Sequence, residues 1–94
     1  MTYRPAPRDT SGVSLPKPIE QLTELLARNT HENWARQRLE DGWRYGPERN
    51  DERKEHPNLV PYEELSEADK DYDRRTAMET VKAILALGYR IEKA

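Results

Sequence analysis

The segment from Ser66 to Gly88 constrains the fold most, because it carries the signals of one complete long helix. Ser66 with Asp69 three residues later resembles a capping box, which satisfies free backbone N–H groups at the start of a helix. Gly88 tolerates the positive φ at which many helices end. Six of the seven residues 81–87 are apolar. The sequence therefore predicts a long helix whose second half is enclosed nearly all round and forms the spine of the core.

A second helical pattern runs from residue 19 to about residue 40. Ile19, Leu22 and Leu26 recur at spacings of three and four, which places them on one helix face. Further along, the apolar positions drift around the helix axis. This drift means either that two neighbours contact the helix or that the helix bends near residues 29–30.

Glycine and proline punctuate the connection between the two helical patterns. Gly42 is placed to end the first helix, and the alternation Trp-Arg-Tyr at 43–45 is typical of an extended segment. Residues 48–56 contain no apolar side chain and predict an exposed connection, whereas residues 59–62 form either a short strand or an ordered loop. The expected fold is mainly α, with two principal helices joined by an extended, loop-rich segment that has short β strands and at most one small antiparallel pair.

The first eighteen residues differ from the rest, since they hold four of the seven prolines. Proline lacks a backbone N–H and interrupts helices, so we expect a flexible or extended arm at 1–18 followed by a single domain at 19–94. With 36% charged and 34% hydrophobic residues in a chain of 94, that domain has a thin core. Association with a second copy is the simplest remedy, and we expect a homodimer.

Charge and composition exclude several classes of protein. Sixteen Lys and Arg against eighteen Asp and Glu give a net charge of −2, which provides no broad positive field for a nucleic acid. No apolar run approaches the ~20 residues that cross a bilayer, and the N-terminus lacks the apolar block of a secretion signal. We therefore expect a cytoplasmic protein that binds neither nucleic acid nor membrane.

The sequence also lacks the patterns of a catalytic or metal site. His31-Glu32 would need a second histidine at position 35 to resemble a helical zinc protease, but Ala35 stands there. Cysteine is absent, and His31 and His56 without a dedicated third ligand are more typical of ordinary hydrogen-bonding groups than of a metal centre. The four glycines stand apart, so no phosphate-binding loop is present. We expect a non-enzyme without metal or cofactor.

His31, Trp34 and Arg38 are the candidate ligand-binding residues. Steps of three and four along a helix place their side chains on one surface. An indole stacks on planar rings and a guanidinium complements phosphate, so the three together fit a nucleotide-like small molecule. In the alternative interpretation, Trp34 is a core anchor, His31 bonds a nearby carbonyl and Arg38 is solvated.

Four sequence words, in the same order, resemble one ryanodine receptor repeat, the RyR domain. They are Asn-Thr-His-Glu-Asn-Trp-Ala at 29–35, Gly-Trp-Arg-Tyr-Gly-Pro at 42–47, His-Pro-Asn-Leu-Val-Pro-Tyr at 56–62 and Glu-Thr-Val-Lys-Ala-Ile-Leu-Ala-Leu-Gly at 79–88. The resemblance covers roughly residues 20–91. It implies the fold of one such repeat and a single-repeat protein of the kind that bacteria and phages encode.

The resemblance also implies a site. Ryanodine receptor repeats pack as pseudo-twofold pairs, with the cleft between the two units as the expected place for adenine-type or drug-like molecules. A homodimer about a true twofold axis would recreate that cleft and bring two copies of Trp34 to it. Asp73 matches a position that faces the same cleft, where many members have Asn. The resulting hypothesis is a non-catalytic ligand-sensing module.

A protein-interaction or scaffold module is the competing hypothesis. Trp43, Arg44 and Tyr45 offer an aromatic and basic surface of the kind that docks a protein partner. In that case the chain would bind an unknown protein and no small molecule.

Overall fold

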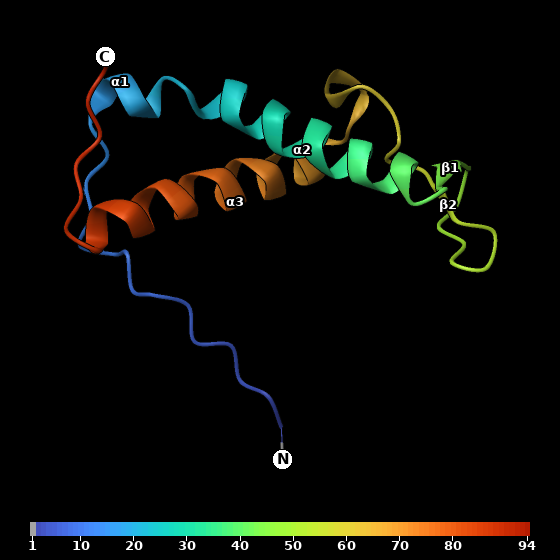
Figure 1. The fold of residues 1–94 in the computed structure, drawn as a ribbon, viewed down its shortest axis with the longest axis horizontal. Coiled ribbons are helices and arrows are strands. Elements are labelled where there is room, and N and C mark those ends of the chain that lie inside the picture. Colours follow the sequence, from blue (N-terminus) through green and yellow to red (C-terminus); the bar gives the residue numbers. More distant parts are fainter. Residues whose placement is uncertain (1) are drawn as a thin grey trace.

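The structure is a computed structural model that describes residues 2–94 (Figure 1). Two long helices dominate it, which confirms the predicted mainly α class. The elements in chain order are α1 (Lys17–Glu20), α2 (Thr23–Glu40), β1 (Arg44–Tyr45), β2 (Glu55–His56), the 3-10 helix η1 (Tyr62–Glu64) and α3 (Glu67–Ala86).

Both ends of α3 form as the sequence predicts. The Ser66 hydroxyl accepts a hydrogen bond from the Asp69 backbone N–H at 3.2 Å. Glu67 and Asp69 lie in the first turn, where the helix dipole favours negative charge. Gly88 follows the helix with a φ of 95°, a conformation that strains residues with a Cβ atom.

The first helical pattern is interrupted at residues 21–22 and not near 29–30. At the break, the Thr23 hydroxyl donates to the Glu20 carbonyl at 2.6 Å, and a side chain that bonds the local backbone competes with helix continuation. From Thr23 onward α2 runs unbroken to Glu40, so the predicted bend is wrong. The drifting stripe instead reflects two neighbours, because α3 and η1 both contact α2.

The two short strands pair in parallel, so the predicted antiparallel pair is wrong. Arg44 lies opposite Glu55, and Tyr45 lies opposite His56. Before it reaches β2 the chain reverses, because Asn50 and Glu55 exchange two backbone hydrogen bonds of 2.9 Å in an antiparallel bridge. This reversal adds to the turn after β1 and brings β2 back in the same direction.

The core is small and lies where α2, η1 and α3 meet. Ala27 of α2, Tyr62 of η1 and Leu65 form its centre, and Val60 packs against them. Met78 of α3 is also buried.

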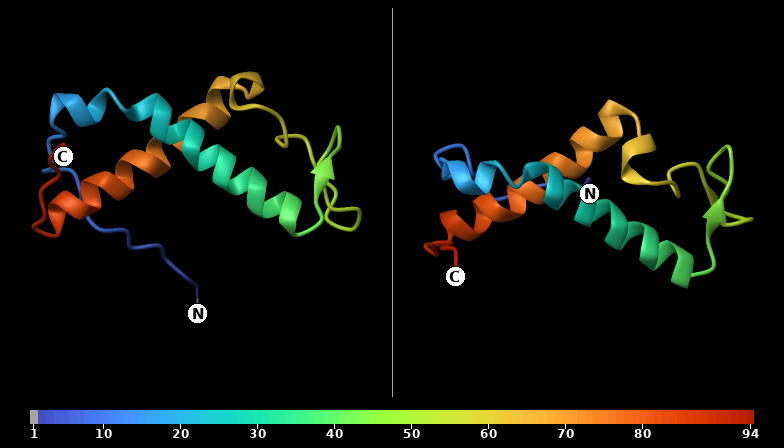
Figure 2. Two further views of the ribbon diagram at one scale, coloured as in Figure 1. Left: turned by 45° about the horizontal axis from the view of Figure 1, so that its top comes forward. Right: turned by 90° about the horizontal axis from the view of Figure 1, so that it is seen from above.

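The second half of α3 is less enclosed than predicted. Leu87 just beyond the helix is 55% exposed, and Ile84 is also exposed. Figure 2 shows α2 crossing α3 obliquely, so α2 covers only part of the apolar surface of α3.

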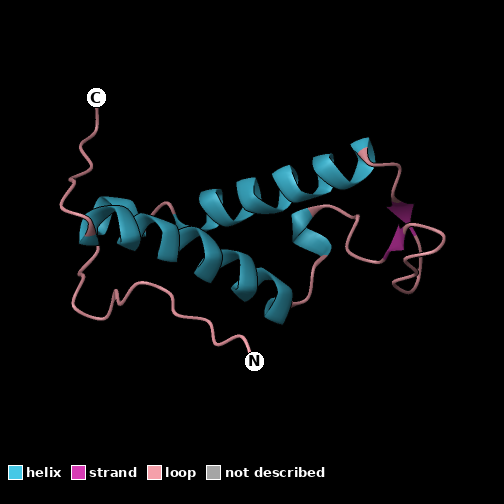
Figure 3. Cartoon of the chain, turned by 60° about the horizontal axis from the view of Figure 1, so that its bottom comes forward, coloured by secondary structure: helices cyan, strands magenta, loops and turns pink. Residues whose placement is uncertain are grey.

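Residues 2–16 contain no helix or strand and leave the helices as an extended segment beside α3 (Figures 1 and 3). The Thr10 hydroxyl attaches this segment to α3 by donating to the Glu79 carboxylate at 2.7 Å. Because α1 begins at Lys17, the boundary between arm and domain at residue 18 stays a prediction. Within residues 2–94, no helix combines the length and apolar character needed to cross a membrane.

Replacing Gly46 with alanine tests how tightly the strand pair packs. A Cβ atom on Gly46 would lie 2.6 Å from the Cβ atom of Glu55, which is closer than two carbon atoms can approach. We expect Gly46→Ala to lower the free energy of unfolding by about 1–3 kcal/mol, the usual cost of overpacking. Urea unfolding followed by circular dichroism measures the change.

Gly12→Ala is the matched control, because nothing lies within 4 Å of the position of its Cβ atom. It should change the free energy of unfolding by no more than about 0.5 kcal/mol. Equal effects of the two substitutions would contradict the steric explanation.

Candidate functional site

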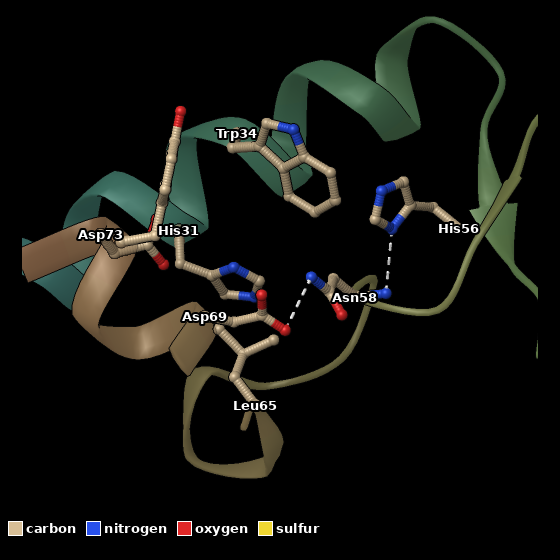
Figure 4. Close-up of a pocket in the computed structure, with 8 residues that line it drawn as sticks. His31, Trp34, His56, Asn58, Leu65, Asp69 and Asp73 are labelled. Carbon is tan, nitrogen blue, oxygen red and sulfur yellow. Dashed lines mark hydrogen bonds between the residues drawn. The ribbon is translucent and has the colours of Figure 1, made fainter. Parts of the chain in front are cut away.

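A cavity of about 200 Å³ opens between α2, the connection that follows β2 and the first turns of α3 (Figure 4). Three of the four predicted ligand-binding residues, His31, Trp34 and Asp73, line it. Five further side chains complete the lining: His56, Asn58, Leu65, Asp69 and Tyr72.

His31 is the most buried polar residue of the site, at 3% exposure. Its Nε2 atom lies 2.7 Å from the Val60 carbonyl oxygen. A carbonyl only accepts hydrogen bonds, so Nε2 carries the proton, and Nδ1 is an acceptor in the neutral ring. The imidazole also stacks on Trp34, with ring centroids 5.7 Å apart. The carbonyl bond expected in the core interpretation is therefore present in a residue that also lines the cavity.

Trp34 is half-buried and forms an aromatic wall of the cavity. His31 stacks on the indole, and His56 meets it edge-on at 4.9 Å. Trp34 is thus neither sealed in the core nor fully exposed. Two imidazoles hold the ring in place, which leaves it available for contact with a ligand inside the cavity.

His56 has a fixed tautomer. Its Nδ1 atom accepts a hydrogen bond from the Asn58 backbone N–H at 3.0 Å, so the neutral ring carries its proton on Nε2. Burial lowers the pKa of His56, and the positive charges of Arg49 and Arg38 lower it further. The imidazole is therefore neutral near pH 7.

Acidic side chains give the cavity its electrostatic character. Asp73 is half-buried, and burial raises the pKa of its carboxyl group; nearby Asp69 adds to this rise and His31 opposes it. Asp69 accepts a hydrogen bond from the Asn58 side-chain amide at 3.3 Å. The lining contains no Lys or Arg. The site is thus rich in hydrogen-bond acceptors and favours donors and positive charge.

Arg38 lies outside the lining of the cavity. Its guanidinium carbon is 5.6 Å from the ring centroid of Trp34 and 4.6 Å from that of Trp43. Arg38 thus contacts both indoles through cation–π interactions, which positions Trp34 from the side. The predicted role in contacting a phosphate has no support from this placement.

The three residues of the predicted protein-interaction surface diverge. Trp43 is half-buried near His56, and Arg44 forms an ion pair with Glu55 at 3.4 Å. Tyr45 is 58% exposed and borders a separate groove on α2.

Sequence reasoning missed five lining residues, and two signals could have found most of them. Asp69, Tyr72 and Asp73 share the spacing of one helix face, the rule that grouped His31 with Trp34. His56 and Asn58 belong to the word His-Pro-Asn that also supports the family resemblance. Their approach to Trp34 depends on how the connection folds back, which no local pattern encodes. Across residues 2–94, no three His, Cys, Asp or Glu side chains are placed to hold a metal ion together.

The architecture defines a small helical repeat domain with a cavity between its two long helices. The chain belongs to the RyR domain family, whose model matches residues 3–93. This family consists of non-enzymatic repeats. The match confirms the resemblance seen in the four sequence words, and it includes most of the extended N-terminal segment.

Asp73→Asn should raise the free energy of unfolding at neutral pH. Burial raises the pKa of Asp73 in the folded state, so its stabilising contribution is complete below the ordinary Asp pKa and is lost as pH rises through the folded-state pKa. Asparagine avoids this loss. The advantage of the variant should therefore grow between about pH 4 and pH 7 in urea unfolding series.

Glu48→Gln is the control, because Glu48 is exposed and lies far from α3 in sequence. It should show no advantage that grows with pH. A stability advantage of Asp73→Asn that is the same at both pH values, or a loss of stability at pH 7, would show that burial does not penalise the Asp73 charge.

Proposed function

We propose that this protein is a non-catalytic binding module for a small planar molecule with hydrogen-bond donors, such as the base of a nucleotide. One observation carries the proposal: a half-buried carboxylate, Asp73, lies in an aromatic-walled cavity, and no Lys or Arg within residues 2–94 forms an ion pair with it. An unpaired buried carboxylate lowers stability, and natural proteins keep such groups mainly at functional sites.

The cavity walls suit a planar ring. The indole of Trp34 and the phenol of Tyr72 come from different helices and both line the cavity. Aromatic faces stack on flat heterocycles, while the edges of such a ring remain free for hydrogen bonds. Asp69, Asp73 and Nδ1 of His31 can accept those bonds, so an exocyclic amino group complements the lining.

The same acids disfavour phosphate inside the cavity. Two carboxylates repel an anion, and Arg38 contacts the indoles outside the lining. A nucleotide would therefore bind through its base, with its phosphates directed toward solvent. This differs from the chemistry that the spacing of Arg38 suggests in the sequence.

A second copy of the chain completes the site in this proposal. A volume of about 200 Å³ is below the ~300–1,000 Å³ of typical ligand pockets. One chain thus supplies part of a pocket. A twofold mate across its open side would enclose the ligand and exclude water, as the pairing of repeats implies.

Isothermal titration calorimetry with adenosine and with inorganic pyrophosphate tests the proposed chemistry. We expect adenosine to bind and pyrophosphate to give no heat, because only adenosine supplies a planar ring with an amino group. Trp34→Ala and Asp73→Asn should each weaken adenosine binding at least tenfold, through loss of a stacking surface and of an acceptor.

Tyr89→Ala is the matched control, because Tyr89 is an exposed aromatic residue in the C-terminal tail. It should leave adenosine binding unchanged. Binding of adenosine that is unaffected by both cavity substitutions would remove this cavity from consideration, and binding of pyrophosphate alone would contradict the donor-selective chemistry.

A protein-interaction module is the second candidate, and the exposure of Tyr45 beside an apolar groove favours it. Purification of the tagged chain from its host would then yield one stoichiometric protein. Tyr45→Ala would abolish that association, and no adenosine response would be seen.

A further inference from the structure

An apolar groove runs along the outer face of α2, separate from the cavity described above. Its lining residues are Glu32, Ala35, Leu39, Tyr45, Leu59, Val60 and Pro61, and its volume is about 410 Å³. Leu39 and Tyr45 are each 58% exposed. Large apolar side chains along a concave surface are typical of a docking site.

The chain exposes more surface than a folded monomer of its size. Its accessible area is 7640 Å², whereas a compact monomer of 11.1 kDa exposes about 5,650 Å². Its radius of gyration of 16.0 Å exceeds the roughly 12.4 Å of a compact domain of this length. The excess area, about 2,000 Å², is close to the total that a stable protein interface buries. A partner of the same size accounts for this excess.

The N-terminal segment contributes to this excess and has the chemistry of a groove ligand. Residues 2–9 are all exposed, and Tyr3 is 83% exposed. Pro5 and Pro7 favour the extended polyproline II helix, which loses little entropy on binding and docks into grooves lined by aromatic residues. This segment is called the arm below.

The charges of the arm and the groove are complementary. Arg4 and Arg8 of the arm form no ion pair within residues 2–94, and neither does Glu32 at the groove. The groove offers a carboxylate where the arm offers two guanidinium groups. Arginine binds carboxylate through paired hydrogen bonds, so Glu32 gives the arm a specific anchor.

The geometry favours the groove of another molecule over the arm's own groove. Thr10 bonds Glu79 on α3, and the arm continues from there alongside α3 on the side away from α2 (Figures 1 and 3). The groove lies on α2 and the connection that ends at Pro61. Eight residues in a polyproline II helix span about 25 Å, which exceeds the roughly 10 Å from Glu32 to Leu39 along α2.

We propose that the arm of one copy docks into the α2 groove of a second copy, with Tyr3, Pro5 and Pro7 on the apolar lining and Arg4 or Arg8 paired with Glu32. In a twofold dimer the exchange is mutual, so two arms and two grooves are covered. The arm and the groove thereby form an interface made only of this chain.

Charge reversal in the full-length chain tests the exchange. Light scattering at tens of micromolar should give about twice 11.1 kDa for the wild type. Glu32→Arg should weaken dimerisation at least tenfold, and so should the double variant Arg4→Glu with Arg8→Glu. Combining all three substitutions in one chain, or mixing the two variants, should restore the dimer, because both arm–groove pairs are again complementary.

A cysteine crosslink reports the contact directly, since the chain contains no cysteine of its own. Tyr3→Cys with Tyr45→Cys should form a disulfide-linked dimer on oxidation. Tyr3→Cys with Tyr89→Cys, which places the second thiol in the tail, should form far less.

Three results would overturn the proposal. The first is a wild type of 11.1 kDa at these concentrations. The second is a dimer that both charge reversals leave unchanged, and the third is a loss that the combined substitutions do not restore. Adenosine titration of every variant scores the proposed ligand site separately, so failure of the arm exchange is distinct from failure of the binding function.

Discussion

The hydrogen bond between His31 and the Val60 carbonyl is the contact on which the site depends. It joins the middle of α2 to the connection, whose own sequence has no helical or strand periodicity to hold it. Because a buried carbonyl must find a donor, the bond fixes the path of the connection and the tautomer of the imidazole together. The fixed imidazole then supports Trp34, and the connection brings His56 and Asn58 against the same indole. A single polar contact thus sets one side of the cavity.

The opposite side depends on a charged contact between the helices. Arg74 of α3 is half-buried and bonds Glu24 of α2, and it also binds Asp71 and Glu67 on its own helix. The guanidinium holds the pKa of Glu24 below its usual range, and Glu24 also accepts from the Tyr62 hydroxyl. These bonds tie α3 to α2 one turn away from Asp73. The position of Asp73 in the cavity therefore follows from the helix pairing, and its cost in stability is consistent with a role in binding.

A thin core connects the fold to its proposed assembly. Only a few apolar side chains are buried, centred on Ala27 and Tyr62, while many large ones remain in contact with water. The sequence anticipates the small core from its composition, but it places the enclosed region at residues 81–87. The structure instead centres the core on η1, because α2 crosses α3 obliquely and η1 fills the angle between them. The apolar area left uncovered is what a second copy would bury.

Local patterns determined the elements of this protein, and long-range contacts decided how they are joined. The caps at Ser66 and Gly88, the two long helices and the proximity of His31 to Trp34 follow from hydrogen bonding and spacing within a few residues, so the sequence alone predicts them. The parallel pairing of the strands and the position of Arg38 between two indoles arise between segments distant in sequence. Such contacts form only if the whole chain folds to one arrangement, because loop closure and packing compete over many alternatives that no single pattern ranks.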